Sequence, residues 1–345
     1  MPSALPPAEL KCKAQSSYLC NPVSKQCQVE SDGVPLSHCQ VGACAPAVDP
    51  QRRIRERQAL ELFAKATTSP TSDGWVHACQ AGWKGNLTDV CARYGITCEP
   101  PSNGYVTKID LSSCGLTGTI PSNTLFTLQD LKEVHLRSEA YKGLTGLQGS
   151  LPSDLSSCTA LEVIDFNSNN LEGKMPSLVK LVNLKTIDAH YNKLSGLLPM
   201  IASSAISYIS FAGNGFTGTI PSGWSALKDI EILGLANNKL SGTADIITQF
   251  PKLVVVFLRN NSFGGEIPKL PNSTAVADFD HNKFSSIAAD ICTPSAPPAF
   301  GKPCGCASDY PSQPFATCCF ANNNFSYDPS KPCIQVSYRP LRHSL

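Results

Sequence analysis

A self-similar segment recurs along the middle of the chain. Residues 161–176, 184–199, 206–221 and 253–268 all fit the template L-x-x-L-x-L-x-x-N-x-L-x-G-x-I-P. One inner strand position of this template recurs every 21 to 24 residues, at Phe166, Ala189, Phe211, Leu235, Leu258 and Phe279. One such coil cannot bury its own apolar face, so it has to stack on its neighbours. The chain is therefore predicted to grow by adding coils around one continuous core.

Each template position has a physical reason. The L-x-L alternation predicts a short strand with one buried face, and the I-P step favours extended backbone. The asparagine turns the chain, and its buried amide can bond to backbone groups of adjacent turns, which predicts a ladder. The ladder positions are Asn169, Asn192, Asn214, Asn238, Asn261 and Asn282. The glycines that permit a tight bend are Gly173, Gly196, Gly218, Gly242 and Gly265.

The two ends of the array are less regular. The first repeat has Cys114 in the asparagine position, and the second has Glu139 there. The second repeat also carries extra residues around Ala140 to Leu144, which form a second candidate contact region. The sixth repeat loses its I-P step and the eighth fades out, which gives eight repeats from about Tyr105 to Ile287.

These residues carry a family resemblance. The L-x-G-x-I-P segment resembles the plant-specific class of leucine-rich repeat (LRR), found in receptor-kinase ectodomains, polygalacturonase-inhibiting proteins and protist surface proteins. Residues 57–66 resemble the amphipathic helix of that family's N-terminal cap. Residues 91–98 resemble its Cys-x6-Cys element, with Tyr94 and Ile96 in place of the usual Trp and Val. The resemblance covers about residues 50 to 290 and implies a right-handed α/β solenoid with a parallel concave β-sheet.

The 16 cysteines gather at the two ends of the chain. Eight precede residue 100 and six follow residue 290, which favours disulfide staples in an oxidising compartment. No C-x-x-C occurs, which disfavours zinc ribbons and thioredoxin-like sites. We expect a structural disulfide between Cys91 and Cys98, and a bond from Cys79 back to the N-terminal cysteines. Cys114 and Cys158 are expected to be buried free thiols.

Four regions follow from this organisation. Residues 1–49 are predicted to form a Cys-rich disulfide knot and residues 50–104 the helical N-terminal cap. Residues 105–290 hold about eight repeats, and residues 291–345 form a Cys-rich C-terminal cap or tail. The disulfide connectivity of the two Cys-rich ends stays open.

Cysteine content favours an extracellular or cell-surface location. Residues 1–10 contain no apolar signal region, and we interpret the chain as a processed or truncated form. Glycosylation candidates agree with export and lie at Asn86, Asn260, Asn272 and Asn324. No run of residues is apolar enough to span a bilayer. The net charge of +1 favours no nucleic-acid partner.

No catalytic, nucleotide-binding or metal-binding motif is present, so the sequence predicts a non-enzymatic protein without a cofactor or metal. Three histidines stand at outward strand positions: His135, His190 and His281. A solvated side chain on a binding surface is the better interpretation for each of them than a ligand of a metal. His135 and His281 are six repeats apart and cannot share one ion.

The template also predicts a binding surface, because residues flanking the inner apolar pair point out of the concave sheet. Successive strands lie about 4.8 Å apart, so eight strands give a floor of about 34 Å. The candidate ligand-binding residues on this face are Asp110, His135, Arg137, Asp165, Asn167, Asp188, His190, Tyr191, Tyr208, Phe257 and Arg259. The first half of this face is charged, with an acidic column that favours a basic ligand. A glycan on Asn260 would obstruct the floor near Phe257, so either that sequon is unused or this end is not the binding site.

Several functions remain open at this point. The leading hypothesis is a recognition protein that binds a protein, peptide or polysaccharide. Alternatives are a structural subunit of a wall, surface or larger assembly, and a secreted inhibitor of a glycosidase. Ice binding is suggested only by T-G-T at residues 117–119 and 217–219, which do not lie on consecutive repeats.

Overall fold

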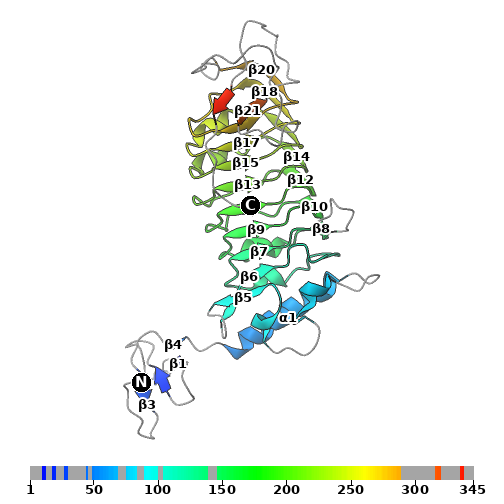
Figure 1. Ribbon diagram of the computed structural model, residues 1–345, viewed down its shortest axis with the longest axis vertical. Helices are drawn as coiled ribbons and strands as arrows, with labels where there is room; N and C mark the ends of the chain where they lie inside the picture. The colour runs from blue at the N-terminus through cyan, green and yellow to red at the C-terminus, as the bar shows by residue number, and fades with distance from the viewer. Residues whose placement is uncertain are drawn as a thin grey trace, which may run out of the picture.

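Stacked coils run along the long axis of the molecule, from the helix α1 at one end to β20 at the other (Figure 1). The computed structural model describes residues 49–68, 75–83, 89–99, 104–138 and 146–288. It also describes the backbone of six short strands nearer the two ends, at residues 10–12, 18–20, 27–29, 44–45, 315–319 and 335–337. We number the coils 1 to 8 by their ladder position, from Cys114 in coil 1 to Asn282 in coil 8. The extra residues Ala140 to Leu144, and Glu139, lie outside the described residues.

The concave sheet has 11 strands, and one short strand from each coil pairs with that of the next coil in parallel. Antiparallel pairs stand only at its two ends, β5 with β6 and β21 with β22. Its strands are β5 Ile96–Glu99, β6 Tyr105–Asp110, β7 Glu133–His135, β9 Val163–Asp165, β11 Thr186–Asp188, β13 Tyr208–Ser210, β15 Ile232–Gly234, β17 Val255–Phe257, β19 Val276–Asp278, β21 Phe315–Cys319 and β22 Gln335–Ser337. The parallel concave sheet predicted from the repeat is confirmed.

A second sheet of seven parallel strands was not predicted. It is built from the L-x-G segments, which the sequence suggested only as bends. Its strands are β8 Gln148–Ser150, β10 Asn170–Lys174, β12 Lys193–Leu197, β14 Gly215–Gly218, β16 Lys239–Gly242, β18 Ser262–Ile267 and β20 Lys283–Ile287. Each coil is therefore hydrogen-bonded to its neighbours along two sides.

The asparagine ladder is confirmed. Asn192 shows the pattern, because its Oδ1 accepts from the backbone N–H of Leu171 in the preceding coil at 3.0 Å. Its Nδ2 donates to the carbonyl oxygens of Phe166, Ala189 and His190 at 3.0, 3.1 and 3.3 Å. The amides of the other five ladder asparagines make the same kinds of bond. Backbone groups that the turn leaves without strand partners are thus satisfied inside the protein.

On the second sheet, side chains of one coil lie over the glycine of the next. A Cβ atom built on Gly218 would lie 2.6 Å from Leu197 Cδ2, and one on Gly242 would lie 2.7 Å from Thr219 Cγ2. Both glycines also have φ near +80°, which L-residues avoid. Hydroxyl groups add a further link, since Ser195 donates to Gly173 O at 3.3 Å.

The core lies between the two sheets and a third side made of short 3-10 turns. These turns are Leu125–Thr127, Ser153–Ser157, Ser222–Ala226 and Asp245–Gln249. Leucine, isoleucine and phenylalanine side chains of every coil are buried, and Trp224 is the largest of the fully buried ones. Because each fully buried leucine, isoleucine or phenylalanine side chain contributes about 1.5–3 kcal/mol, the stacked core provides most of the stability.

The cap helix α1 spans Pro50–Ala66 and covers the N-terminal end of the coils (Figure 1). It begins earlier than residue 57, because Asp49 Oδ1 accepts from Gln51 N at 2.9 Å and proline stands at the first helical position. A smaller four-stranded sheet lies nearer the N-terminus and consists of β1 Leu10–Cys12, β2 Tyr18–Cys20, β3 Cys27–Val29 and β4 Cys44–Ala45.

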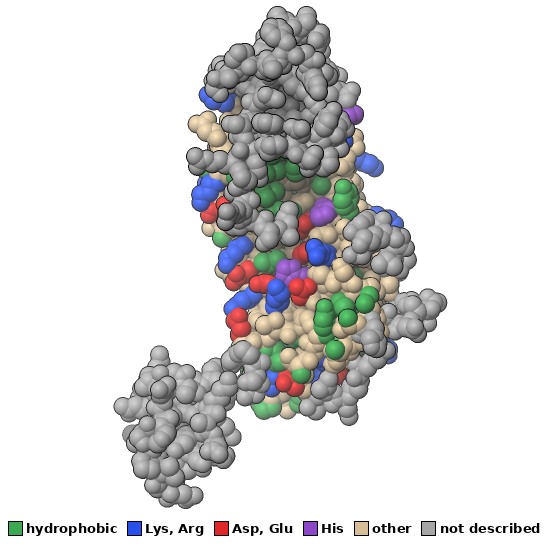
Figure 2. Space-filling view, viewed as in Figure 1, with side chains coloured by type: hydrophobic (Ala, Val, Ile, Leu, Met, Phe, Trp, Pro, Cys, Tyr) green, Lys and Arg blue, Asp and Glu red, His purple; other side chains and the backbone are tan. Residues whose placement is uncertain are grey.

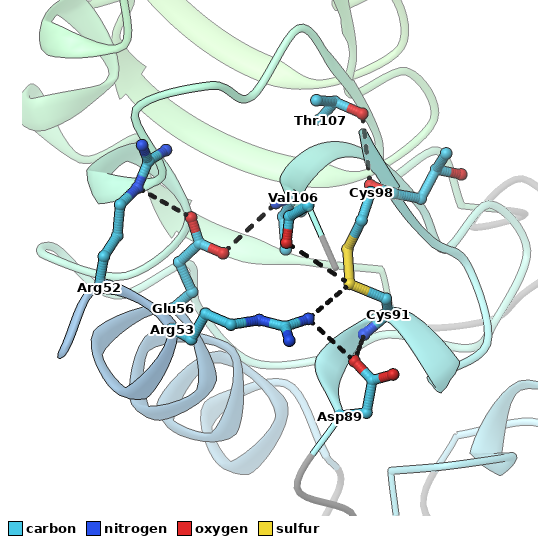
Figure 3. The surroundings of a disulfide bond; sticks show 10 residues. Arg52, Arg53, Glu56, Asp89, Cys91, Cys98, Val106 and Thr107 are labelled. Carbon is cyan, nitrogen blue, oxygen red and sulfur yellow. Dashed lines mark hydrogen bonds and ion pairs between the residues drawn. A yellow bond between two sulfur atoms is a disulfide. The ribbon is translucent and has the colours of Figure 1, made fainter. Parts of the chain in front are cut away.

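Two disulfides hold the cap region. The expected bond between Cys91 and Cys98 is present, and Figure 3 shows the Arg53 guanidinium beside it, donating to Asp89 at 3.2 Å. The expected bond from Cys79 to the N-terminal cysteines is wrong, because Cys79 is bonded to Cys114. Cys114 is therefore not a free thiol either.

The position of Cys114 explains this correction. It occupies the ladder position of coil 1, which faces the cap rather than a preceding coil, and Val76 N donates to Cys114 O at 2.9 Å. Cys158 is a buried free thiol as predicted, and burial raises its pKa to about 12. No helix among the described residues is both long and apolar enough to cross a membrane.

Candidate functional site

Outward side chains of the concave sheet are aligned in columns, because one residue of each strand pairs with one residue of the next. In the column that we call the first column, Asp110 lies opposite His135, and His135 opposite Asp165. The full first column is Asp110, His135, Asp165, Asp188, Ser210, Gly234, Phe257 and Asp278. Two residues further along each coil, backbone hydrogen bonds align a second column of Ser112, Arg137, Asn167, His190, Ala212, Ala236, Arg259 and Asp280. The alignment predicted from the repeat period is confirmed.

The aspartates of the first column have a structural role that the sequence did not reveal. Asp110 Oδ1 accepts from the backbone N–H of Ser112 at 3.3 Å, and Asp188 Oδ1 accepts from that of His190 at 3.1 Å. Asp165 and Asp278 make the equivalent bond two residues ahead. Each carboxylate therefore shapes the turn after its strand and uses one oxygen to do so.

A charged cluster crosses the first coils. Lys108 Nζ lies 2.8 Å from Glu133 Oε2, and His135 Nε2 lies 3.2 Å from the same oxygen. His135 Nδ1 lies 3.7 Å from Asp165 Oδ2 in the next strand. Asp165 and then Glu133 raise the pKa of His135 against the effect of its burial. Burial alone would raise the pKa of Glu133, but Lys108 and His135 together lower it.

Coil 4 extends this cluster. His190 Nδ1 lies 2.5 Å from Asp188 Oδ1, and the Tyr208 hydroxyl donates to Asp188 Oδ2 at 3.4 Å. Burial and the nearby Asp188 carboxylate raise the pKa of Tyr208, so its phenol stays neutral. Figure 2 shows acidic, basic and histidine side chains gathered together across the middle of the molecule. We call Lys108, Glu133, His135, Asp165, Asp188 and His190 the charged cluster.

Coils 5 to 7 present a different surface. Here the strands expose aromatic and aliphatic side chains, and Phe257 keeps 37% of its surface accessible. Gly234 and Ala236 leave a low floor beside them, with Ala236 5% exposed. Arg259 lies at the edge of this surface, where its Nη1 is 3.8 Å from Asp278 Oδ2. The concave face is thus charged over the first four coils, apolar from coil 5 to Phe257, and charged again at Arg259 and Asp278.

A third column follows the second and has an unusual backbone. Its residues precede the ladder positions, and seven of them have φ between +50° and +66°: Ser113, Ser168, Tyr191, Gly213, Asn237, Asn260 and His281. Small, amide or histidine side chains at this position are a sequence signal for a left-handed residue. Tyr191 departs from that signal, since a bulky residue in this conformation costs about 1–2 kcal/mol.

The structure places all 11 candidate residues on the concave side. Arg137 is exposed and its side chain forms no hydrogen bond or ion pair within the described residues, while Asn167 Nδ2 donates to Asp165 Oδ1 at 2.7 Å. Their ligand-binding role stays a prediction. Of the glycosylation candidates, Asn260 and Asn272 are exposed, and Asn86 and Asn324 lie outside the described residues. Over the part of the chain that the structure describes, no three His, Cys, Asp or Glu side chains form a group that could hold a metal.

Comparison with known proteins gives related repeat proteins. The family model of the EGF-like domain-containing protein ComC LRR domain matches residues 103–240. Receptor-like protein 35 of Arabidopsis thaliana is 31% identical over 252 residues, covering 58% of this chain and 26% of that protein. Receptor-like protein kinase 7 of the same plant is 29% identical over 184 residues, covering 52% of this chain and 16% of that protein. The chain thus spans about a quarter or less of the length of these relatives.

Solved structures agree on the fold. The LRR ectodomain of the Arabidopsis thaliana receptor kinase GASSHO1/SCHENGEN3, in complex with CASPARIAN STRIP INTEGRITY FACTOR 2, has a TM-score of 0.57 at 24% identity. That match covers 67% of this chain and 30% of the ectodomain. The PEPR1–AtPEP1 structure has a TM-score of 0.51 at 22% identity, over 70% of this chain and 36% of that one. The chain is a leucine-rich-repeat solenoid, and it is similar to plant receptor-like proteins in sequence and to plant receptor-kinase ectodomains in fold.

Proposed function

We propose that this chain is a non-enzymatic recognition protein of the extracellular space or cell surface, and that it binds a protein or peptide through its concave sheet. The charged cluster is the observation that carries this proposal. It brings carboxylates from adjacent coils into one column, and the oxygen that is not used in the turn has a more distant partner, His135 at 3.7 Å from Asp165 and the Tyr208 hydroxyl at 3.4 Å from Asp188. The two disulfides among the described residues fit an oxidising compartment.

The chemistry of the cluster favours a basic segment of the ligand. Asp165 and Asp188 stand opposite each other on neighbouring strands, which lie about 4.8 Å apart. Like charges directly across a sheet destabilise it, and His135 beside Asp165 and His190 beside Asp188 offset this repulsion only to the extent that the two rings are protonated. A lysine or arginine side chain of the ligand would relieve the remainder. Two of the relatives carry the name receptor-like protein, and this name supports a recognition function for the present chain.

The test uses immobilised synthetic peptides of equal length with basic, neutral or acidic side chains. Each aspartate is replaced by asparagine, because the asparagine side-chain oxygen accepts the same backbone N–H and the turn after the strand is kept. We expect basic peptides to bind, and Asp165→Asn with Asp188→Asn to weaken binding about tenfold or more. Asp229→Asn with Asp245→Asn, which removes two carboxylates outside the sheet, should leave affinity unchanged. Equal binding by both double variants would contradict the proposed site.

A further inference from the structure

Tyr191 is the one large aromatic side chain among the seven left-handed positions of the third column. It is also the most exposed tyrosine or phenylalanine of the described residues, at 58% against 44% for Tyr94 and 37% for Phe257. A tyrosine that is both exposed and held in this backbone conformation does not contribute to the core. Its ring is therefore available to a ligand.

Neighbouring side chains fix the orientation of this ring. In the next coil Gly213 stands at the same position, and a Cβ atom built on it would lie 2.5 Å from Tyr191 Cδ1 and 3.0 Å from Cε1. The Tyr191 ring thus occupies the space that a side chain at position 213 would need, and any residue other than glycine there would displace the ring. On its own coil, the ring of His190 meets it edge-on, with centroids 5.0 Å apart. One side of the ring is held by the protein and the other remains accessible.

The same column continues with hydrogen-bonding groups. Asn237 and Asn260 follow Gly213 on the next two coils and are both exposed. Asn260 Nδ2 donates to Asn237 Oδ1 at 3.0 Å, which orients the two amides as a pair. Within the described residues, this leaves the side-chain NH₂ group of Asn237 and the side-chain oxygen Oδ1 of Asn260 available for a ligand. Ala212 and Ala236 lie beside this line and leave space next to it.

A stacking ring followed by amides, in steps of about 4.8 Å along one line, matches the chemistry of a chain of sugar rings. Sugar rings offer an apolar C–H face to an aromatic ring and hydroxyls that donate to and accept from amides. The charges beside the line occur as pairs, Asp188 with His190 and Arg259 with Asp278, so no excess of cations favours an acidic sugar. We propose that Tyr191, Asn237 and Asn260 form a binding site for a neutral oligosaccharide.

This site differs in ligand and in residues from the peptide site proposed above, so either can fail alone. It is tested on the full chain produced in a host that adds no N-glycans, because Asn260 is itself a glycosylation candidate. The probes are cellohexaose, xylohexaose and mannohexaose, with hexagalacturonate and a proline-rich decapeptide as comparators. Affinities are measured by titration calorimetry, and contacts by ligand-observed NMR.

The test variant is Tyr191→Asn, because asparagine stands at the same position in coils 6 and 7 and accepts the left-handed conformation. Tyr94→Asn is the matched control, since it removes an exposed tyrosine in the N-terminal cap. We expect at least one neutral hexasaccharide to bind saturably, Tyr191→Asn to weaken that binding about tenfold, and Tyr94→Asn to leave it within about twofold.

The thermal unfolding temperature of Tyr191→Asn should equal or exceed that of the parent protein. This result excludes misfolding as the cause of the weaker binding. Three results would overturn the proposal. They are the absence of binding by every neutral hexasaccharide, binding of hexagalacturonate or the proline-rich peptide in preference to them, and an equal effect of both tyrosine variants.

Discussion

The ring of Tyr191 lies against Gly213, the residue at the same position of the following coil, and leaves no room for a side chain there. Gly213 also has φ of +66°, so two separate constraints act on it. We expect Gly213→Ala to lower the free energy of unfolding by about 2–4 kcal/mol, from backbone strain and from the clash. In a Tyr191→Asn background only the backbone part, about 1–2 kcal/mol, should remain. Urea unfolding of the four proteins measures this coupling, and strictly additive effects would show that the two residues are independent.

The asparagine ladder gives a second prediction. Asn192→Ala removes one accepted and three donated hydrogen bonds inside the protein. It leaves the backbone groups that Asn192 contacts without this side-chain partner. We expect a loss of about 2–4 kcal/mol, measured as a lower urea midpoint. Asn183→Ala is the matched control, because its one bond to Thr159 O is exposed, and it should cost less than about 0.5 kcal/mol. Comparable losses of stability in both variants would show that the asparagine ladder does not stabilise the fold.

The disulfide between Cys79 and Cys114 closes a sequence separation of 35 residues. Its removal as Cys79→Ala with Cys114→Ala should cost about 3–4 kcal/mol through the entropy of the unfolded chain. Cys114 stands at a ladder position, so Cys79→Ala with Cys114→Asn should recover part of that loss. Chemical unfolding under identical buffer conditions compares the two double variants. No gain from asparagine would mean that coil 1 cannot extend the ladder.

The histidine at the centre of the charged cluster predicts a dependence of stability on pH. Asp165 and Glu133 hold the pKa of His135 above its usual value of about 6.5. A raised pKa in the folded protein contributes stability that is complete below the unfolded pKa and is lost as pH rises through the folded pKa. Wild-type protein should therefore exceed His135→Gln in stability by more at about pH 5.5 than at about pH 8.5. Glu133 adds nothing in this window, because its lowered pKa places its titration further into acid. Thermal unfolding at both pH values checks the sign, and a larger difference at alkaline pH would contradict it.

The repeat period made the concave face predictable from the sequence. Each coil contributes one residue to each column, so Asp110, His135 and Asp165 could be aligned without coordinates. The side-chain amide of Asn192 was equally predictable, because a buried amide has to be satisfied by whatever backbone is near.

Other features depend on contacts that no periodicity records. The second sheet could not be predicted from the sequence, because the glycine in L-x-G interrupts the alternation that identifies a strand. Each of its strands also pairs with strands of other coils. The partner of Cys114 depends on how the segment around Val76 returns to coil 1. The start of α1 was missed, although Asp49 followed by Pro50 is a recognised signal for a helix N-terminus.

The placement of side chains over the next coil's glycine has a consequence for how such arrays diverge. Leu197 constrains Gly218, and Thr219 constrains Gly242, but neither glycine restricts the coil that follows it. Structural dependence along this surface therefore runs in one direction, from each coil toward its C-terminal neighbour. A coil that carries the glycine accepts a predecessor with an overlying side chain as large as Leu197, whereas its own overlying side chain requires glycine in its successor. On this side of the molecule, an overlying side chain and the glycine of the next coil therefore have to be inherited together. Recombination within a coil can keep such a pair intact, whereas recombination at the boundary between two coils separates it.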